Sequence, residues 1–347
     1  MAPRTVRVLL LGDTHLGFDL PSRPRIERRR RGPDFFAAYE RALSPTRRGQ
    51  VDVVVHGGDL LYRSKVPSWL VARAMEPLFE VADRGVPVFV VPGNHERSRI
   101  PYPLLTRHPG VHVFEAPSTF RVDVRGTTVA LSGFPFARVI AGESFAALLA
   151  ATGWASTPAD LRLLCLHQAV EGARVGVQDF TFRRGPDVLA GRDVPAGFAA
   201  VLSGHIHRAQ VLTQDLRGRP LPAPVVYPGS TERTSFAERA EPKGYVLLEL
   251  VPGRGSRQPW VLGSRRFVPL PTRPMVVVDL DVDGLSRKEL ASRLRARLAT
   301  LDPDAVVRLR CDGVPRADAA PLLSAPTLRT LAPRTMNVEL PRPFPRA

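Results

Sequence analysis

The stretch VFVVPGNHE, from Val88 to Glu96, indicates how this chain folds. Its four leading apolar residues have the length of a buried strand, and the Pro-Gly pair that follows ends that strand. Asn94 and His95 then lie in the loop just past the carboxyl end of the strand, where open α/β sheets bind ligands. Taken alone, the triplet Gly-Asn-His could equally be turn chemistry, because Gly and Asn are common turn residues.

The same arrangement, an apolar strand followed by a polar loop with Asp or His, occurs four more times. These strands are expected at residues 6–11, 51–55, 161–166 and 198–202. We expect the polar residues of the five loops to converge at one site. With His56 set aside, they are two Asp, one Asn and five His: Asp13, His15, Asp59, Asn94, His95, His167, His205 and His207.

These residue types predict a metal centre. Side chains two apart in an extended segment point the same way, so Asp13 and His15 can reach one ion, as can His205 and His207. Carboxylate, amide and imidazole ligands together suit manganese, iron or zinc better than magnesium or calcium. The ligands are too many for one ion, and two ions roughly 3.5 to 4 Å apart that share a carboxylate fit the number. Such a pair lowers the pKa of a bound water and attracts phosphoryl oxygens, so a phosphate ester is the expected ligand.

Composition limits the class of protein. The formal net charge of +16 over 347 residues suggests a polyanionic partner, although nearly all the basic residues are Arg, a usage that can reflect genomic base composition. The two cysteines, Cys165 and Cys311, are far apart, which predicts neither a disulfide nor a cysteine zinc site, and Cys165 is expected to be buried filler. Without a long apolar run or a signal-like start, we expect a cytoplasmic protein with no membrane contact.

Strands and helices should alternate in the first part of the chain, as in a layered α/β domain. Asp34 is expected to cap a helix that runs to about Leu43, and a second helix should run from about Ser68 to Arg84. Between residues 111 and 133 we expect antiparallel strands that extend the sheet. Later segments predict a short helix, a long loop and a second sheet of four short strands: 143–151 for the helix, 171–197 for the loop, and 209–214, 224–227, 243–251 and 260–268 for the strands.

The proline-rich segment PLPTRP, Pro269 to Pro274, is a candidate domain boundary. We therefore expect one domain at 1–270 and a second at 271–347, with a disordered end, PRPFPRA. The second domain should be a small α+β unit: a strand at 275–282, a helix at 286–298 capped by Ser286, and a strand at 305–311.

Five short blocks resemble, in the same order, the signature blocks of the calcineurin-like metallophosphoesterases: GDTH at 12–15, GGD at 57–59, GNHE at 93–96, His167, and GHIH at 204–207. The resemblance covers most of residues 5–250. It implies an α/β fold, a two-sheet metallophosphoesterase sandwich flanked by helices, with a small C-terminal α+β capping domain. It also implies a hydrolase with two divalent ions, manganese being our preferred choice.

The resemblance further implies a role for each residue of the blocks. The ions would be held as follows, with Asp59 as the bridge: one by Asp13, His15, Asp59 and His207, the other by Asp59, Asn94, His167 and His205. His95 would face the substrate, stabilise the transferring phosphoryl group and help to protonate the leaving oxygen, with Glu96 as the partner that orients it. His56, His108 and His112 have no place in the pattern and are expected to be structural or exposed.

Residues Tyr227 to Leu250 are similar to the segment after the last metal block in the SbcD-type nucleases of DNA double-strand-break repair, with a Tyr-x-Gly-Ser turn and a Lys-Gly strand. SGFPFAR (132–138) and RFVPLPTRP (266–274) resemble the same group, whose small module caps the groove and contacts DNA; here it would be 272–340. The resemblance predicts a manganese-dependent DNA nuclease in repair or recombination, an exonuclease on duplex ends and/or an endonuclease on single strands, which uses a hydroxide activated by two metals.

DNA would require a basic groove beside the metals. The candidate contacts are these: Tyr62, Arg63, Arg138, Arg208, Arg233 and the loop from Arg23 to Arg31. Tyr62 stands where those nucleases often have His. The resemblance also implies two candidate partners, a second copy of the chain in a homodimer and an SbcC-type ATPase. However, the stretch 98–108 is short and proline-interrupted where those nucleases build a dimerising helix, and no helical tail for the ATPase is evident.

Two other functions remain open from the sequence. The metal blocks are equally compatible with a phosphodiesterase or phosphatase for small molecules such as cyclic nucleotides. A DNA-binding scaffold without catalysis is disfavoured, because no residue of the ligand set is missing.

Overall fold

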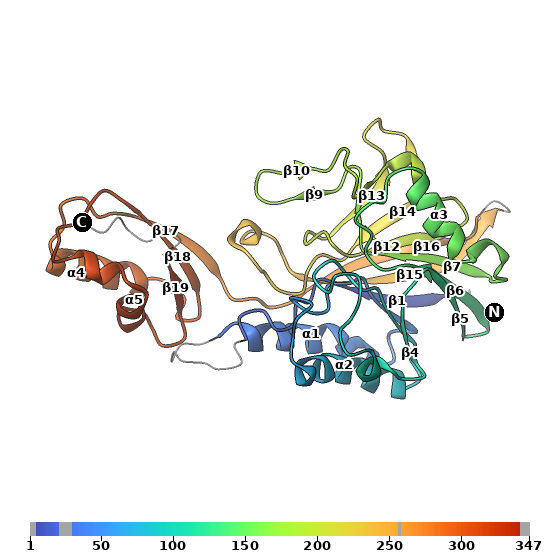
Figure 1. The fold of residues 1–347 in the computed structure, drawn as a ribbon, viewed down its shortest axis with the longest axis horizontal. Helices are drawn as coiled ribbons and strands as arrows, with labels where there is room; N and C mark the ends of the chain where they lie inside the picture. Colours follow the sequence, from blue (N-terminus) through green and yellow to red (C-terminus); the bar gives the residue numbers. More distant parts are fainter. Residues whose placement is uncertain (1–4, 21–29, 256–257, 341–347) are drawn as a thin grey trace. The chain divides into compact units, whose positions relative to one another are not determined.

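A computed structural model of the chain describes residues 5–20, 30–255 and 258–340. The chain divides into two compact units, both drawn in Figure 1. The first unit takes its residues from Met1–Phe18, Gly32–Thr234 and Glu241–Pro271, and the second from Asp19–Arg31, Ser235–Ala240 and Thr272–Ala347. The second unit thus includes two short segments that precede the proline-rich stretch in sequence.

The first unit contains two six-stranded sheets. In the first sheet the order is β16-β15-β1-β2-β3-β4. Strands β1 to β4 are parallel, and β15 and β16 extend the sheet antiparallel to their neighbours. The bounds are as follows: β1 Val6–Leu11, β2 Val53–His56, β3 Val88–Val90, β4 Val111–Val113, β15 Gly244–Gly255 and β16 Gln258–Pro269.

The second sheet has the order β13-β14-β12-β7-β6-β5. Its four inner strands are parallel, and the edge strands β5 and β13 pair antiparallel. The bounds are as follows: β5 Ser118–Val124, β6 Thr127–Gly133, β7 Leu161–Leu166, β12 Ala200–Ser203, β13 Gln210–Gln214 and β14 Pro220–Tyr227.

Helices and short elements complete the first unit. The helices are α1 Gly32–Arg47, α2 Ser68–Asp83 and α3 Glu143–Ala151, with the 3₁₀ turns η1 Pro103–Thr106, η2 Trp154–Ser156 and η3 Gly191–Asp193. Between β7 and β12 lie four two-residue strands: β8 Ala169–Val170, β9 Arg174–Val175, β10 Phe180–Thr181 and β11 Val188–Leu189. The loop expected at 171–197 therefore carries short strands of its own.

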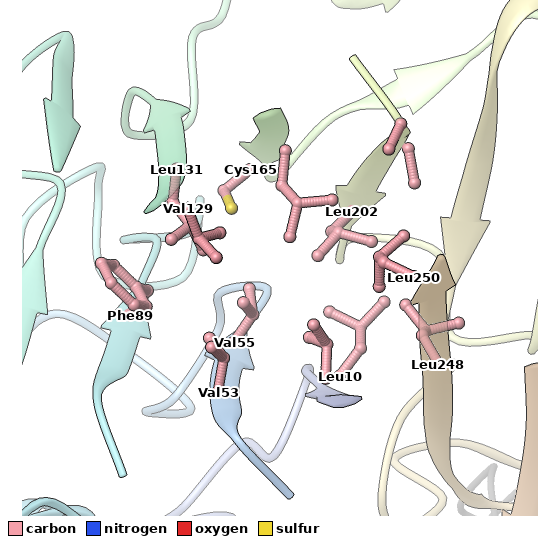
Figure 2. Close-up of a cluster of buried hydrophobic side chains, with 14 of the residues drawn as sticks. Leu10, Val53, Val55, Phe89, Val129, Leu131, Cys165, Leu202, Leu248 and Leu250 are labelled. Carbon is pink, nitrogen blue, oxygen red and sulfur yellow. The ribbon is translucent and has the colours of Figure 1, made fainter. Parts of the chain in front are cut away.

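The main core lies between the two sheets (Figure 2). Leu10, Val53 and Phe89 point inward from the first sheet towards Leu131 and Cys165 of the second. Each fully buried aliphatic or aromatic side chain stabilises the fold by about 1.5 to 3 kcal/mol relative to exposure. The sulfur of Cys165 belongs to this core, which confirms its prediction as buried filler.

The second unit is a parallel three-stranded sheet, β17-β18-β19, packed against helices. The expected cap is confirmed: the Ser286 hydroxyl accepts a hydrogen bond from the Glu289 amide, and the Glu289 carboxylate accepts one from the Ser286 amide. The elements are η4 Phe236–Glu238, β17 Met275–Asp281, α4 Arg287–Ala299, β18 Val306–Asp312, η5 Ala320–Leu323, α5 Ala325–Leu331 and β19 Asn337–Glu339. The expected disorder of PRPFPRA lies outside the described residues.

Three expectations about these elements were wrong. Helix α1 starts at Gly32, so Asp34 lies in its first turn instead of capping it, and buried packing carries the helix past Pro45 to Arg47. Strand β4 is parallel to β3, and the antiparallel β5–β6 hairpin belongs to the second sheet. Strands β15 and β16 join the first sheet, because β15 pairs with β1. Alternating apolar residues define a buried face but not the sheet that receives it.

Among the described residues, no helix combines the length and the apolar character that crossing a membrane requires.

Candidate metal centre

The structure brings the seven predicted ligands together. On one side, the Nε2 atoms of His15 and His207 lie 2.9 Å apart, and the Nε2 of His207 is 3.7 Å from a carboxylate oxygen of Asp13. On the other side, the amide oxygen of Asn94 is 3.0 Å from a ring nitrogen of His167 and 3.0 Å from one of His205. These are the two ligand groups that the resemblance implied.

Asp59 lies between the two groups. Its Oδ2 is 3.4 Å from the Nε2 of His167 and 3.9 Å from the Nε2 of His15. Its other oxygen, Oδ1, accepts a 2.9 Å hydrogen bond from the main-chain amide of His95, which fixes the orientation of the carboxylate. One oxygen of a nearly buried carboxylate therefore faces ligands of both groups, as a bridging ligand requires.

The loops that carry these ligands are held in a strained conformation. Asp13, His15, Asp59 and His205 all have φ between 45° and 80°, which non-glycine residues rarely adopt. The Asp13 amide donates to the Gly58 carbonyl at 2.8 Å, and the His15 amide donates to the Asp59 carbonyl at 3.0 Å, so the first two loops support each other. Each such residue costs of order 1 to 3 kcal/mol, and strain of this kind gathers at functional sites.

Two glycines of the blocks are required by space. A Cβ at position 58 would lie 2.2 Å from the Nδ1 of His167, and Gly58 has a φ of +110°. A Cβ at position 93 would lie 2.1 Å from the Oδ1 of Asp59. Gly58 and Gly93 therefore allow the ligand side chains to approach the main chain of neighbouring loops.

Burial and mutual charge shift the pKa of the ligands. Burial alone would lower the pKa of His167, but the nearby Asp59 carboxylate raises it to about 9. Burial raises the pKa of Asp59, yet the charge of His167 and a hydrogen bond with it outweigh burial and lower that pKa. Burial also raises the pKa of Asp13, to about 6. Without a metal, the carboxylates retain a proton on His167, so metal binding would displace protons.

The donor set fits divalent ions. Imidazole nitrogens, carboxylates and one carboxamide oxygen crowd into one region, with triads of donor atoms within 4.8 Å of one another. One triad, formed by Asp13, Asp59 and His167, places Asp13 close to both groups. Ions of the manganese, iron and zinc class are those that such mixed donors bind.

Comparison with known proteins agrees with this geometry. The sequence profile described as Calcineurin-like phosphoesterase matches residues 6–209. The chain belongs to the calcineurin-like phosphoesterase family. Within it, the chain is similar to a protein named DNA double-strand break repair protein Mre11 from Haloferax volcanii, with 32% identity over 320 residues, covering 88% of this chain and 61% of that protein.

Other relatives carry the same name. The protein from Archaeoglobus fulgidus is 26% identical over 81% of this chain and 63% of its own length. The protein from Halobacterium salinarum is 30% identical over 88% of this chain and 71% of its own length. The chain thus spans less than two thirds of the first two relatives. A solved structure, TT1561 of Thermus thermophilus, also matches, with a TM-score of 0.42 and 12% identity over 71% of this chain and 94% of that one, a likeness that adds nothing to the family assignment.

Within this phosphoesterase centre, the prediction that Glu96 orients His95 was wrong. The Glu96 carboxylate is buried and accepts main-chain hydrogen bonds from Leu61 at 2.6 Å and Gly93 at 2.7 Å. The Nδ1 of His95 lies 2.7 Å from the main-chain carbonyl of Tyr62 instead. Glu96 therefore fastens the second loop to the third, and a carbonyl oxygen, which no sequence pattern reveals, orients the imidazole.

The three histidines outside the blocks hold structural positions, as expected. The Nδ1 of His56 accepts a 3.2 Å hydrogen bond from the Gly58 amide and its Nε2 is 3.1 Å from the Thr14 hydroxyl. The ring of His108 stacks on Phe79, and that of His112 stacks on Phe89.

The candidate substrate contacts differ in whether their side chains are exposed or already engaged in ion pairs and hydrogen bonds. The Tyr62 ring packs edge-on against His15, and the exposed Arg63 guanidinium lies 5.8 Å from the centre of that ring. Arg138 is exposed. Arg208 was predicted to position phosphate but is occupied by ion pairs with Asp179 and Glu241, the latter 3.0 Å long. Arg233 also donates to the main chain of Glu241, at 3.0 Å. Of the loop from Arg23 to Arg31, residues 23–29 lie outside the described part of the chain.

The sequence analysis singled out the segment that contains Tyr227 and Lys243 but missed the supporting role of these two residues. The buried Tyr227 hydroxyl donates to the Gln168 carbonyl and accepts from the Val170 amide, both at 2.9 Å, and so fixes the loop that holds His167. The buried Lys243 donates to the main-chain carbonyl of His207 at 2.9 Å. A signal was present, because this lysine lies in a chain whose basic residues are almost all arginine.

Proposed function

We propose that this chain is a manganese-dependent DNA nuclease, acting as an exonuclease on duplex ends and/or an endonuclease on single strands in repair or recombination. The observation that carries the proposal is the position of Asp59 Oδ2, which faces predicted metal ligands of both groups. Relatives named as DNA double-strand break repair proteins and the net charge of +16 favour DNA over a small ester.

Two ions would use the ligands predicted from the sequence, with Asp59 between them. Bound there, they would supply Lewis acidity, which lowers the pKa of water and stabilises negative charge on phosphoryl oxygens. Asp13, His15 and His167 are themselves buried, so their donor atoms would meet little competition from bulk water. The backbone bonds between the loops keep those donors preorganised, so little reorganisation is needed when the substrate reacts.

In this proposal, His95 would act on the substrate. Its Nδ1 faces the Tyr62 carbonyl, which can only accept a hydrogen bond, so Nδ1 carries the proton and Nε2 is the atom that exchanges one. The side chain is about one third exposed, at 36%, and Nε2 lies 3.9 Å from Asp59 Oδ2. Protonated, His95 would stabilise the transferring phosphoryl group and donate its Nε2 proton to the leaving oxygen.

The direct test measures cleavage. Labelled linear duplex and single-stranded DNA would be incubated with the purified chain and manganese, with His95→Gln as the test variant. His108→Gln serves as a matched control, because His108 lies away from the ligand groups. We expect cleavage by the wild type and the control, and a loss of about 10² to 10⁴ in rate for His95→Gln.

Absence of cleavage, or equal cleavage by His95→Gln, would overturn the proposal. A high turnover on cyclic nucleotides that competitor DNA does not inhibit would identify the small-molecule phosphodiesterase instead.

The proposal extends to the second unit and to a partner. Residues 272–340 would form a capping domain that contacts DNA, and an SbcC-type ATPase would associate with the chain. Photocrosslinking to DNA followed by peptide mapping tests the first point, since crosslinks confined to the first unit would contradict it. Coelution with a coexpressed ATPase tests the second.

A further inference from the structure

The first unit contains a cavity of about 450 Å³. None of the predicted metal ligands is among the residues that line it. It is bounded by the loop that enters α3, the segment that leads into β11, the turn η3 and the turn between β13 and β14; α3, β13 and β14 are labelled in Figure 1. Its volume is in the range of ligand sites, about 300 to 1,000 Å³.

The lining is strongly basic. Five of its thirteen residues are arginine, whereas Lys and Arg together supply only 49 of the 347 residues of the chain. The arginines come from three separate segments: Arg183, Arg184, Arg192, Arg217 and Arg219. The general abundance of arginine therefore does not account for this concentration.

The acidic residues of the lining are used in building its walls. The Glu171 carboxylate accepts a 2.9 Å hydrogen bond from the Gly191 amide, which joins the end of β8 to η3. The Asp215 carboxylate accepts the main-chain amides of Arg217 and Arg219 and pairs with the Arg219 guanidinium at 2.6 Å, which closes the β13–β14 turn. The third acidic residue of the lining, Asp193, has its carboxylate 3.7 Å from the Arg192 guanidinium. All three carboxylates are therefore engaged, and none neutralises the remaining guanidinium groups.

Arg183, Arg184 and Arg217 are exposed, and none has a carboxylate partner among the residues that the structure describes. Three like charges around one hollow repel one another, and an anion in the hollow relieves that repulsion. The guanidinium group binds phosphate oxygens through two parallel hydrogen bonds, so phosphate is the anion that this lining suits best.

We propose that this cavity binds the phosphate group of a nucleotide, either free or at the end of a nucleic-acid strand. The site is separate from the proposed hydrolytic centre and requires no metal. Binding can therefore be measured in a chelator, where hydrolysis cannot contribute, and failure of one proposal leaves the other intact.

The experiment is fluorescence anisotropy in excess chelator with two probes. One probe is a fluorescent AMP analogue, and the other is a labelled oligonucleotide compared with and without a 5′-phosphate. The test variant is Arg183→Gln/Arg184→Gln/Arg217→Gln. The matched control, Arg121→Gln/Arg265→Gln/Arg266→Gln, removes the same number of charges from exposed positions on β5 and β16 of the same unit.

We expect the test variant to weaken binding of at least one probe about tenfold or more, and the control less than about threefold. Loss of AMP binding identifies a free nucleotide as the ligand. Loss confined to the 5′-phosphorylated strand identifies a strand end. Binding of neither probe by the wild type, or equal weakening in both variants, would overturn the proposal in favour of unspecific attraction by net charge.

Discussion

The ammonium group of Lys243 donates a 2.9 Å hydrogen bond to the main-chain carbonyl of His207. That carbonyl also accepts the Ser230 amide at 3.1 Å, so two residues from the segment after the last metal block hold the backbone of a predicted ligand. The Lys243 side chain is fully buried, and its charge is balanced by Glu241 at 3.3 Å. A compact ammonium with three donors suits this position, and the longer, planar guanidinium of arginine does not.

We predict that Lys243→Met weakens metal binding about 10- to 100-fold, because partners that orient ligands have effects of this size. Isothermal titration calorimetry with manganese measures the affinity, and thermal unfolding shows that the variant is folded. Asp52→Asn is the control, since it loosens the start of β1, away from the ligands. A folded Lys243→Met variant with wild-type affinity would remove the positioning role.

The hydrogen bonds of the Asp52 carboxylate lead us to expect that the free energy of unfolding depends on pH. Its carboxylate accepts three hydrogen bonds from Arg7, at 2.8 to 3.0 Å, and one from Arg125 at 2.9 Å. Burial raises the pKa of Asp52, but the hydrogen bonds and charge of Arg7 outweigh burial and lower it. The stabilisation is therefore fully present above the ordinary pKa of about 3.9 and is lost as the pH falls through the lowered value.

We expect Asp52→Asn to lower the free energy of unfolding by about 1 to 2 kcal/mol at pH 7 and by less below pH 4. Urea unfolding at several pH values measures this, with Asp123→Asn, on the edge strand β5, as the control. A deficit that stays constant down to pH 3 would contradict the lowered pKa.

The sequence was sufficient to predict that the candidate ligands lie together, but not to predict the residues that support them. Asp13, Asn94 and His207 could be predicted, because each follows a strand and strand ends gather at one edge of a sheet. The role of Glu96 could not be predicted. Its position next to His95 in sequence suggests a contact with that residue, but its carboxylate accepts hydrogen bonds from main-chain amides instead. Arg208 likewise has the charge for phosphate, but only the fold reveals its acidic partners.

Gly93→Ala should disturb the bridge. The new methyl group would lie 2.1 Å from Asp59 Oδ1 and 2.5 Å from the main-chain nitrogen of Asp59, so both the carboxylate and the loop that carries it must move. We expect manganese affinity to fall at least about tenfold, as for the loss of one well-placed ligand contact. Gly85→Ala is the control: it has a φ of +79° but nothing within 4 Å of the new methyl, so it should cost about 1 kcal/mol of stability and leave affinity intact. Equal affinities in the two variants would contradict the role given to Gly93.

Metal binding should stabilise the fold through Asp59. A ligand that binds only the native state adds about 2.7 kcal/mol at one hundred times its dissociation constant, so manganese should raise the Tm of the wild type and excess chelator should reverse the rise. Because Asp59 faces both ligand groups, Asp59→Asn should abolish most of the rise, whereas His207→Gln, which alters one group, should leave part of it. Differential scanning fluorimetry across a manganese titration measures all three proteins. If Asp59→Asn and His207→Gln lose the same fraction of the shift, Asp59 is not the bridge between two ions.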